Sequence, residues 1–160
     1  MSRTTSERAL ILFFRLIMAW TFLYAASHQV FVTWSVADFL NSTKTFHPLY
    51  VHFTGPAIAP ILTFLVGYGH LLIGLSLLVG LGVRLSAIFG IGLMLLYWTA
   101  HMNFPYISDT NNFLIDEHIV NAGVLVLLIV ERAGHVWGLD TWAAELPFVR
   151  RQPFLKWIVG

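Results

Sequence analysis

The chain has 160 residues, of which 58% are hydrophobic and 11% charged, and its formal net charge is +1. This profile is typical of a membrane-embedded bundle rather than of a water-soluble domain, and the near-neutral charge gives no indication of nucleic-acid binding. Cysteine is absent, which excludes disulfides, thiolate chemistry and iron–sulfur ligation by this chain. Any redox role therefore depends on a bound organic cofactor, a haem or another subunit.

The first predicted transmembrane helix covers residues 9–28 and carries Arg15 near its start and His28 near its end. Arg3 and Arg8 precede its apolar stretch, as cations do in a signal peptide. The stretch is nevertheless long and is interrupted by Arg15, and we therefore interpret it as a retained helix.

Residues 32–56 follow as a polar and aromatic connection, in which the segment around Asp38 predicts a short helix at the membrane interface. The second and third predicted transmembrane helices cover residues 58–81 and 85–102. Since only a tight turn around Gly82 separates them, they are expected to form an antiparallel hairpin.

The fourth predicted helix covers residues 114–131, after a polar loop at residues 103–113. The chain ends in residues 141–160, where tryptophans mixed with cations are typical of an interfacial tail. Helices of about 20 residues are long enough to span a bilayer. The sequence thus predicts an all-α fold, an integral membrane four-helix bundle that forms one domain over residues 1–160.

Lysine and arginine residues predict the orientation of this bundle. With four helices, the N-terminus, the turn at Arg84 and the C-terminus lie on one side of the membrane, and the loops on the other side hold only Lys44. Because positive residues favour the cytoplasmic side, both termini are expected in the cytoplasm of a multi-pass plasma-membrane protein.

Four of the seven histidines, His28, His70, His101 and His118, lie within or at the edge of the predicted helices. Ionisable residues are costly inside a membrane and are therefore default candidates for function. Helix rise places His70 and His118 at a similar depth, roughly 18–20 Å above the cytoplasmic edge. His101 and His28 lie higher, toward the outer surface.

Three interpretations of these histidines stay open. They hydrogen-bond between helices as neutral polar residues, they bind a quinone head group by donating to its carbonyls, or two of them ligate a haem b iron or another metal. A bis-histidine haem needs two facing imidazoles at one depth, and His70 with His118, or His28 with His101, are the pairs that fit. All four are candidate cofactor-binding residues, and His70 and His118 are the metal ligands if a haem or metal is present.

Three other polar residues have simpler explanations. Arg15 is expected to reach the cytoplasmic surface or to pair with Glu131. Asp116 and Glu117 are expected to cap the fourth helix and to favour its N-terminal dipole. Glu117 also lies beside His118, so it is the candidate catalytic residue that passes protons to a redox centre.

Two parts of the chain resemble the DoxX/DoxD family. The first has His70, Gly74, Gly80 and Arg84 at the spacing of the second-helix signature of that family. The second is similar to the end of its last helix and comprises residues 115–120 and 133–140. The resemblance covers roughly residues 8–140.

The resemblance implies a four-helix integral membrane protein. Some family members are subunits of thiosulfate:quinone oxidoreductase, which passes electrons to the quinone pool, and others accompany redox complexes. The family usually carries a glutamate at the position of His70 and often a lysine where this chain has Ser27-His28-Gln29. Imidazoles in place of an acid and a base favour a ligand or cofactor role over the ion pair of the family.

The leading hypothesis is a membrane subunit of a quinone-linked respiratory oxidoreductase, similar to that of thiosulfate:quinone oxidoreductase. Its expected partners are other membrane or redox subunits, the lipid bilayer and quinone. The alternatives are a haem-b-binding electron-transfer subunit, a non-catalytic anchor that assembles a larger redox complex, and a small transporter with a histidine proton relay.

Overall fold

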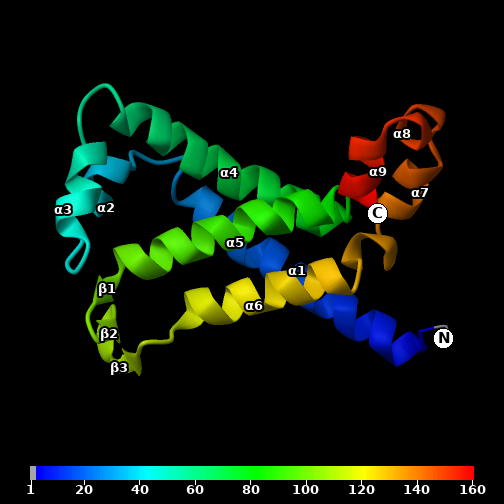
Figure 1. Cartoon of the computed structure of the whole chain (residues 1–160), viewed down its shortest axis with the longest axis horizontal. Coiled ribbons are helices and arrows are strands. Elements are labelled where there is room, and N and C mark those ends of the chain that lie inside the picture. Colours follow the sequence, from blue (N-terminus) through cyan, green and yellow to red (C-terminus); the bar gives the residue numbers. More distant parts are fainter. Residues whose placement is uncertain (1–2) are drawn as a thin grey trace.

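Four helices that run alternately in opposite directions form the body of the molecule (Figure 1). The computed structural model describes residues 3–160. The four helices are α1 (Thr5–Ser27), α4 (Ala59–Val79), α5 (Val83–Ala100) and α6 (Glu117–Val130). This order confirms the predicted all-α class and the antiparallel hairpin of the second and third helices.

Three of the four helices are long and apolar enough to cross a membrane, namely α1, α4 and α5. The fourth, α6, has 14 residues and therefore a length of about 21 Å, which is less than a hydrocarbon core of about 30 Å. It begins at Glu117 rather than at residue 114 because the side chain of Asp116 accepts a hydrogen bond from the backbone N–H of His118. Asp116 thus caps the helix, as predicted.

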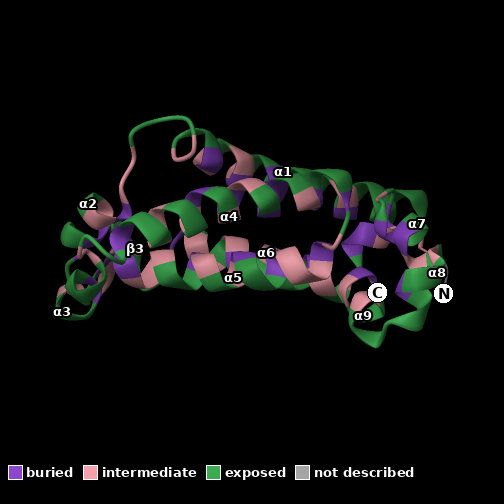
Figure 2. Cartoon of the chain, turned by 90° about the horizontal axis from the view of Figure 1, so that it is seen from above, coloured by how far each residue is buried: buried purple, intermediate pink, exposed green. Residues whose placement is uncertain are grey.

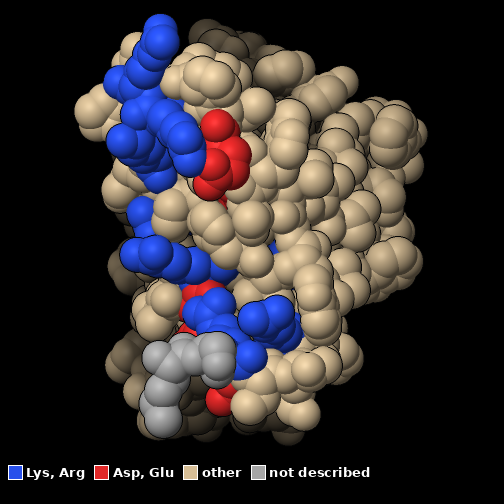
Figure 3. Space-filling model, turned by 90° about the vertical axis from the view of Figure 1, so that its right-hand side faces the viewer, with Lys and Arg blue, Asp and Glu red and all other residues tan. Residues whose placement is uncertain are grey.

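The two ends of the bundle differ in charge. We call the end with both termini the basic end (residues 3–8, 80–84 and 131–160) and the opposite end the sheet end (residues 28–58 and 101–116). Of the nine lysine and arginine residues, only Lys44 belongs to the sheet end, and Figure 3 shows lysine and arginine side chains gathered along one side of the basic end. The prediction that both termini are cytoplasmic rests on this asymmetry.

At the sheet end, the two connections fold into short elements. The first contains α2 (Val36–Asn41), which confirms the expected helix around Asp38, followed by α3 (His47–Tyr50) and η1 (Val51–Phe53). The second was predicted as a loop but forms an antiparallel sheet in the order β1-β2-β3. Its strands pair Met102 with Ile107 and Tyr106 with Phe113, and they are β1 (Met102–Asn103), β2 (Tyr106–Ile107) and β3 (Asp109–Phe113).

At the basic end, the C-terminal segment packs against the bundle. It comprises η2 (Ala133–His135), α7 (Asp140–Glu145), α8 (Pro147–Arg151) and α9 (Pro153–Val159). Arg84, in the first turn of α5, donates to the carbonyl of Trp157 at 2.9 Å, and the Nε2 of His135 hydrogen-bonds to the carbonyl of Val159 at 2.6 Å. The predicted interfacial tail is therefore a small helical cap on the turn between α4 and α5.

The core lies along the centre of the bundle, where α1 packs mainly on α4 and α5 mainly on α6. Figure 2 shows buried residues between the helices and exposed residues on their outer faces. Met18, Phe22 and Leu77 are almost fully buried, whereas Trp20 and Leu72 on the same helices are exposed. Apolar side chains on the outside of a helical bundle are typical of contact with lipid.

Candidate functional site

Three of the predicted histidines meet around one tyrosine. The phenol ring of Tyr97 lies 5.7 Å from the rings of both His70 and His118 and 5.9 Å from that of His101, measured between centroids. His118 also stacks on His101 at 5.1 Å. We call these four residues the Tyr97 cluster. It joins α4, α5 and α6, and it unites histidines that helix rise alone had placed at two depths.

The first nitrogen, Nδ1, of each histidine in the cluster is already hydrogen-bonded. In His70 it lies 2.8 Å from the carbonyl of Val66, and in His101 it lies 2.9 Å from the carbonyl of Tyr97. A carbonyl only accepts, so Nδ1 carries the hydrogen in both rings. The Nε2 of a neutral ring then has a free lone pair, and within residues 3–160 no side chain or backbone group hydrogen-bonds to it.

His118 is held in the same way by a carboxylate. Its Nδ1 lies 2.6 Å from Oδ2 of Asp116, whose side chain is fully buried. Asp116 therefore has two functions: it caps α6 and it orients the imidazole of His118. A buried carboxylate in this position also balances a positive charge on the ring. In a neutral ring the free Nε2 accepts a proton, and in a protonated ring it donates one. Donation from these histidines to a quinone carbonyl therefore stays a prediction.

Gln29 completes the polar part of the site from the end of α1. Its amide nitrogen donates to the hydroxyl of Tyr97 at 3.1 Å, while its amide oxygen is buried without a hydrogen-bond partner among residues 3–160. The Tyr97 hydroxyl accepts from Gln29, which leaves its own hydrogen available to a further acceptor. A buried polar atom without a partner is costly and is typical of sites that complete themselves with a ligand or water.

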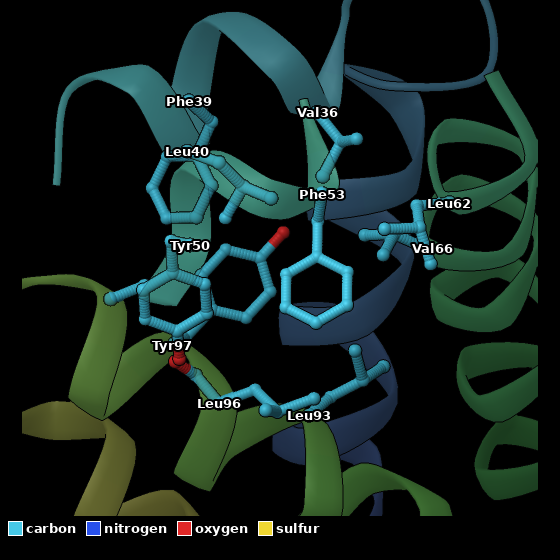
Figure 4. A pocket seen from close by; sticks show the side chains of 11 residues that line it. Val36, Phe39, Leu40, Tyr50, Phe53, Leu62, Val66, Leu93, Leu96 and Tyr97 are labelled. Atoms are coloured by element: carbon cyan, nitrogen blue, oxygen red, sulfur yellow. The ribbon is translucent and has the colours of Figure 1, made fainter. Parts of the chain in front are cut away.

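An apolar cavity of about 240 Å³ adjoins the cluster. Its walls come from α2, η1, α4 and α5, whose side chains point toward one another in Figure 4. Phe39 and Phe53 lie on one side, and Leu93 and Val66 lie on the other. Tyr97 belongs to both the cavity wall and the histidine cluster. The cavity surface itself is almost entirely apolar, so Tyr97 lies between the cavity and the polar groups.

The other two predicted site residues lie apart from this arrangement. His28 is exposed at the end of α1, where its ring packs on Tyr24 at 4.6 Å and its Nδ1 hydrogen-bonds to Ser27 and to the carbonyl of Tyr24. Glu117 is exposed in the first turn of α6. It is the neighbour of the buried Asp116 and of His118, and so it lies where the cluster approaches water.

The rings do not fit a bis-histidine haem. His101 and His118 are stacked with an angle of 23° between their planes, and nearly parallel stacked rings cannot bind one iron from opposite faces of a porphyrin. His70 and His118 are each packed against Tyr97. The Tyr97 ring thus occupies the space next to both imidazoles. A second group, Asp116, Glu117 and His118, places one ligand-type atom of each residue within 4.8 Å of the others, but Asp116 already holds the His118 ring.

Arg15 lies in a different polar network, at the basic end. It is 1% exposed, and its guanidinium donates to the carbonyls of Ala133 at 2.6 Å and Val136 at 2.8 Å. The expectation that it would reach the surface or pair with Glu131 was wrong, because Glu131 instead pairs with Arg3 at 2.9 Å. A buried cation is costly unless its donors find partners. Carbonyls of the segment after α6 bind both terminal nitrogens of Arg15, whereas its Nε has no hydrogen-bond partner among residues 3–160.

Asp140 holds the same segment to the turn between α4 and α5. Its carboxylate accepts from the backbone N–H of Gly82 at 2.6 Å and from that of Val83 at 3.3 Å. Burial raises the pKa of Asp140, whereas the two N–H groups and the charges of His135 and Arg15 act in the opposite direction. We call the joined elements, Arg15, residues 80–83 and residues 133–140, the Arg15 network.

The DoxX model matches residues 10–102, more than half of the chain. The chain belongs to the DoxX family. Searches of functionally curated proteins and of solved structures gave no match. Gly80, one of the glycines of the resemblance, has φ +73°, and a Cβ atom added there would lie 2.7–2.8 Å from Gly138 and Arg15. A glycine at this position therefore leaves room for the Arg15 network.

Neither Tyr97 nor Gln29 was predicted from the sequence as a residue of the site. A usable signal existed for Tyr97, because it lies four residues before His101 and therefore on the same face of α5. Gln29 lies next to His28 in the sequence but points to a different neighbour, and nothing in its type or spacing distinguishes it.

Proposed function

We propose that this DoxX-family protein is the quinone-binding membrane subunit of a quinone-linked respiratory oxidoreductase similar to thiosulfate:quinone oxidoreductase. The observation that carries the proposal is the double position of Tyr97, which forms a wall of an apolar cavity and contacts three histidines. Pockets for small ligands typically combine apolar walls with a few convergent polar groups. Here the cavity surface is apolar and the polar groups lie beside it around Tyr97, so in this proposal the apolar quinone ring occupies the cavity and its carbonyl oxygens approach Tyr97.

In this proposal the cavity side chains bind the ring and Tyr97 orients it. Phe39, Phe53 and Leu93 supply apolar contact. Aromatic side chains favour an offset or edge-on arrangement of a further ring packed against them. The Tyr97 hydroxyl is fixed by Gln29 and directs its free hydrogen to a carbonyl oxygen. Gln29 thereby acts as a positioning residue.

In this proposal the histidines take up and release protons. Reduction of a bound quinone consumes two electrons and two protons, and the chain has no cysteine with which to hold an iron–sulfur centre, so the electrons come from a partner subunit. His70 and His118 take up protons at their free Nε2 atoms and pass them to the quinone oxygens as it is reduced, and Asp116 balances the charge on protonated His118. Glu117, exposed beside this pair, exchanges protons with water at the sheet end.

Filling the cavity tests the binding step. Leu93→Trp places a large side chain in the cavity wall, and we expect it to abolish saturable binding of a short-chain benzoquinone, followed by quenching of tryptophan fluorescence in the purified protein. Leu72→Trp is the matched control, because Leu72 is exposed on the outer face of α4. Equal binding by both variants would refute the cavity as the quinone site.

Removing an imidazole tests the proton step. His70→Ala is expected to lose quinone reduction in the assembled complex while the bundle still assembles, since His70 is held by one backbone hydrogen bond and by ring contacts. Normal turnover in this variant would end the assignment. If cavity and histidine variants instead alter only the amount of assembled complex, the protein is a non-catalytic anchor.

A further inference from the structure

The cavity beside the Tyr97 cluster has an open side. Two of the residues that line the cavity are also exposed at the surface, Leu96 of α5 by 58% and Phe53 of η1 by 39%. Tyr97, the next residue after Leu96, instead packs on the histidines of the cluster. The cavity therefore has an inner side at Tyr97 and a mouth at Leu96 and Phe53.

The packing of α4 and α5 explains this mouth. Close to the turn that joins the two helices, the hydroxyls of Ser76 and Ser86 lie 2.7 Å apart. The two helices nevertheless pack on each other far less than α1 packs on α4, and Figure 1 shows them diverging toward the sheet end. Leu62 and Val66 from α4 and Leu93 from α5 line the cavity where the helices have separated.

The mouth faces lipid rather than water. Leu96 lies four residues before the end of α5 at Ala100, or about 6 Å along the helix axis, and α5 is long and apolar enough to cross a membrane. Exposed apolar side chains within such a helix contact hydrocarbon. The residues that line the cavity are all uncharged, so the passage from the mouth to Tyr97 is apolar as well.

The cavity is too small to enclose a lipid-soluble quinone completely. Its volume is about 240 Å³, whereas pockets that bury a whole drug-sized molecule measure about 300–1,000 Å³. A substituted benzoquinone ring fits into this space, but the polyisoprenoid tail that keeps a quinone in the bilayer does not. The tail of a ring bound at Tyr97 must therefore leave through the mouth.

A glycine lies beside the mouth on α4. Gly69 follows Val66 by three residues and is therefore on the same face of the helix. Among the described residues, the only side chain within 4 Å of a Cβ atom added at Gly69 is that of Leu93, at 4.0 Å. The surface between α4 and α5 is thus open at Gly69, and a tail that leaves the mouth finds room there.

We propose that the protein takes a long-chain quinone directly from the bilayer through this mouth. The ring lies in the cavity against Tyr97, and the hydrocarbon tail passes Leu96 and Gly69 into the lipid between α4 and α5. The inference rests on the proposed function and names its substrate class, a lipid-soluble quinone rather than one that arrives from water.

The position of the polar groups favours a quinone over a phospholipid as the occupant. These groups lie beyond Tyr97 on the inner side, whereas the mouth is apolar. A quinone presents a carbonyl oxygen to the inner side and its tail to the mouth. An acyl chain that entered the same way would place a methyl group against Tyr97 and offer its hydroxyl no acceptor.

Two quinones and one glycine test the path of the tail in the full chain. Gly69→Leu adds a side chain beside the mouth, so the variant should bind a benzoquinone without a tail as the wild type does. A decyl-substituted benzoquinone should bind about tenfold more weakly, because the added side chain overlaps with its tail. Gly92→Leu is the matched control, since nothing lies within 4 Å of a Cβ atom added at Gly92 and this residue does not line the cavity.

A labelled thiol tests the mouth without any quinone. Because the chain has no cysteine, Leu96→Cys introduces a single site for a fluorophore. In bilayers, a nitroxide on a lipid acyl chain should quench this label more strongly than a water-soluble nitroxide does. The same label at Asp109→Cys, at an exposed position of β3, should show the opposite order.

The possible failures are distinguishable from one another. If the wild type binds neither quinone, the proposed function fails and the tail path fails with it. If both quinones bind but Gly69→Leu and Gly92→Leu affect the decyl quinone equally, the cavity stays the quinone site and the tail path is overturned. Stronger quenching of the Leu96→Cys label by the water-soluble nitroxide would overturn entry from lipid, and displacement of the tail-less quinone by added phospholipid would assign the cavity to an acyl chain.

Discussion

The Arg15 network and the Tyr97 cluster are both buried polar assemblies, but they differ in the partners of their hydrogen-bonding groups. Arg15 donates to three backbone carbonyls, and Asp140 accepts from two backbone N–H groups. In the Tyr97 cluster, each histidine uses one ring nitrogen and the amide oxygen of Gln29 has no partner among residues 3–160. The partners of the Arg15 network are backbone groups, and only the Nε of Arg15 lacks a hydrogen bond among residues 3–160, whereas the Tyr97 cluster borders a cavity.

The difference separates structure from function within one bundle. A buried polar network whose partners are mainly backbone fixes the path of the chain, because its loss leaves several groups without hydrogen bonds. Under the proposed function, the Tyr97 cluster, with free lone pairs beside an apolar cavity, gains its remaining partners from a bound quinone. Stability should therefore depend on the Arg15 network, and ligand chemistry on the Tyr97 cluster.

Arg15→Met should give the largest loss of stability. It keeps an unbranched side chain but leaves the carbonyls of Ala133 and Val136 and the carboxylate of Asp140 without their cation, and breaking a buried ionic network costs about 3–5 kcal/mol. Unfolding in detergent, followed by circular dichroism, measures the change. Arg151→Met, at an exposed cation, is expected to match the wild type; a similar loss in both variants would contradict the special role of Arg15.

Gly134→Ala should destabilise next most strongly. A Cβ atom there would overlap the carboxylate of Asp140, which must then move away from Gly82 and Val83, and overpacking of this kind costs about 1–3 kcal/mol. Gly123→Ala is the matched control, because nothing lies within 4 Å of its added Cβ. If the two variants unfold alike, the segment after α6 is not held as tightly as its contacts indicate.

The same comparison shows which parts of the molecule were predictable. Apolar runs located α1, α4 and α5 to within a few residues, since membrane helices are defined by their own composition. The three-stranded sheet was missed because its strands have two to five residues and are defined by pairing with one another. The partners of Arg15 were missed for a related reason: they are carbonyls more than 100 positions away, and every residue type has a carbonyl.

The candidate site was predictable in its residue types and not in its grouping. The cost of polar groups in a membrane pointed to His70, His101 and His118, whereas their meeting around Tyr97 depends on how α5 and α6 rotate against each other. His28 satisfied the same criterion and faces outward at the end of α1. Burial of a histidine thus has to be established from packing.

A smaller effect is expected from pH, through Asp140. Burial raises the pKa of Asp140, so the folded state favours its neutral acid form. The stability that this preference contributes is complete below the ordinary pKa of an aspartate and is lost as pH rises through the raised value. Asp140→Asn has no such titration, so the stability of the wild type relative to this variant should fall with rising pH. Asp109→Asn, at an exposed site in β3, should show no such trend. If the stability of the wild type relative to Asp140→Asn instead rises with pH, the charge of Arg15 outweighs burial in setting the pKa of Asp140.

Tyr97→Phe should change stability least and function most. The hydroxyl makes a single hydrogen bond, to Gln29 at 3.1 Å, and its removal costs about 0.5–1.5 kcal/mol, while the ring contacts with the three histidines remain. Quinone affinity should nevertheless fall, because the cavity loses the hydroxyl that reaches a carbonyl oxygen. Tyr50→Phe is the control, since its hydroxyl is committed to Thr99 at 2.6 Å and to the carbonyl of Leu96. Unfolding and quinone titration of both variants separate the two effects: a variant of Tyr97 that binds quinone normally would place the cluster with the Arg15 network, as a second structural assembly.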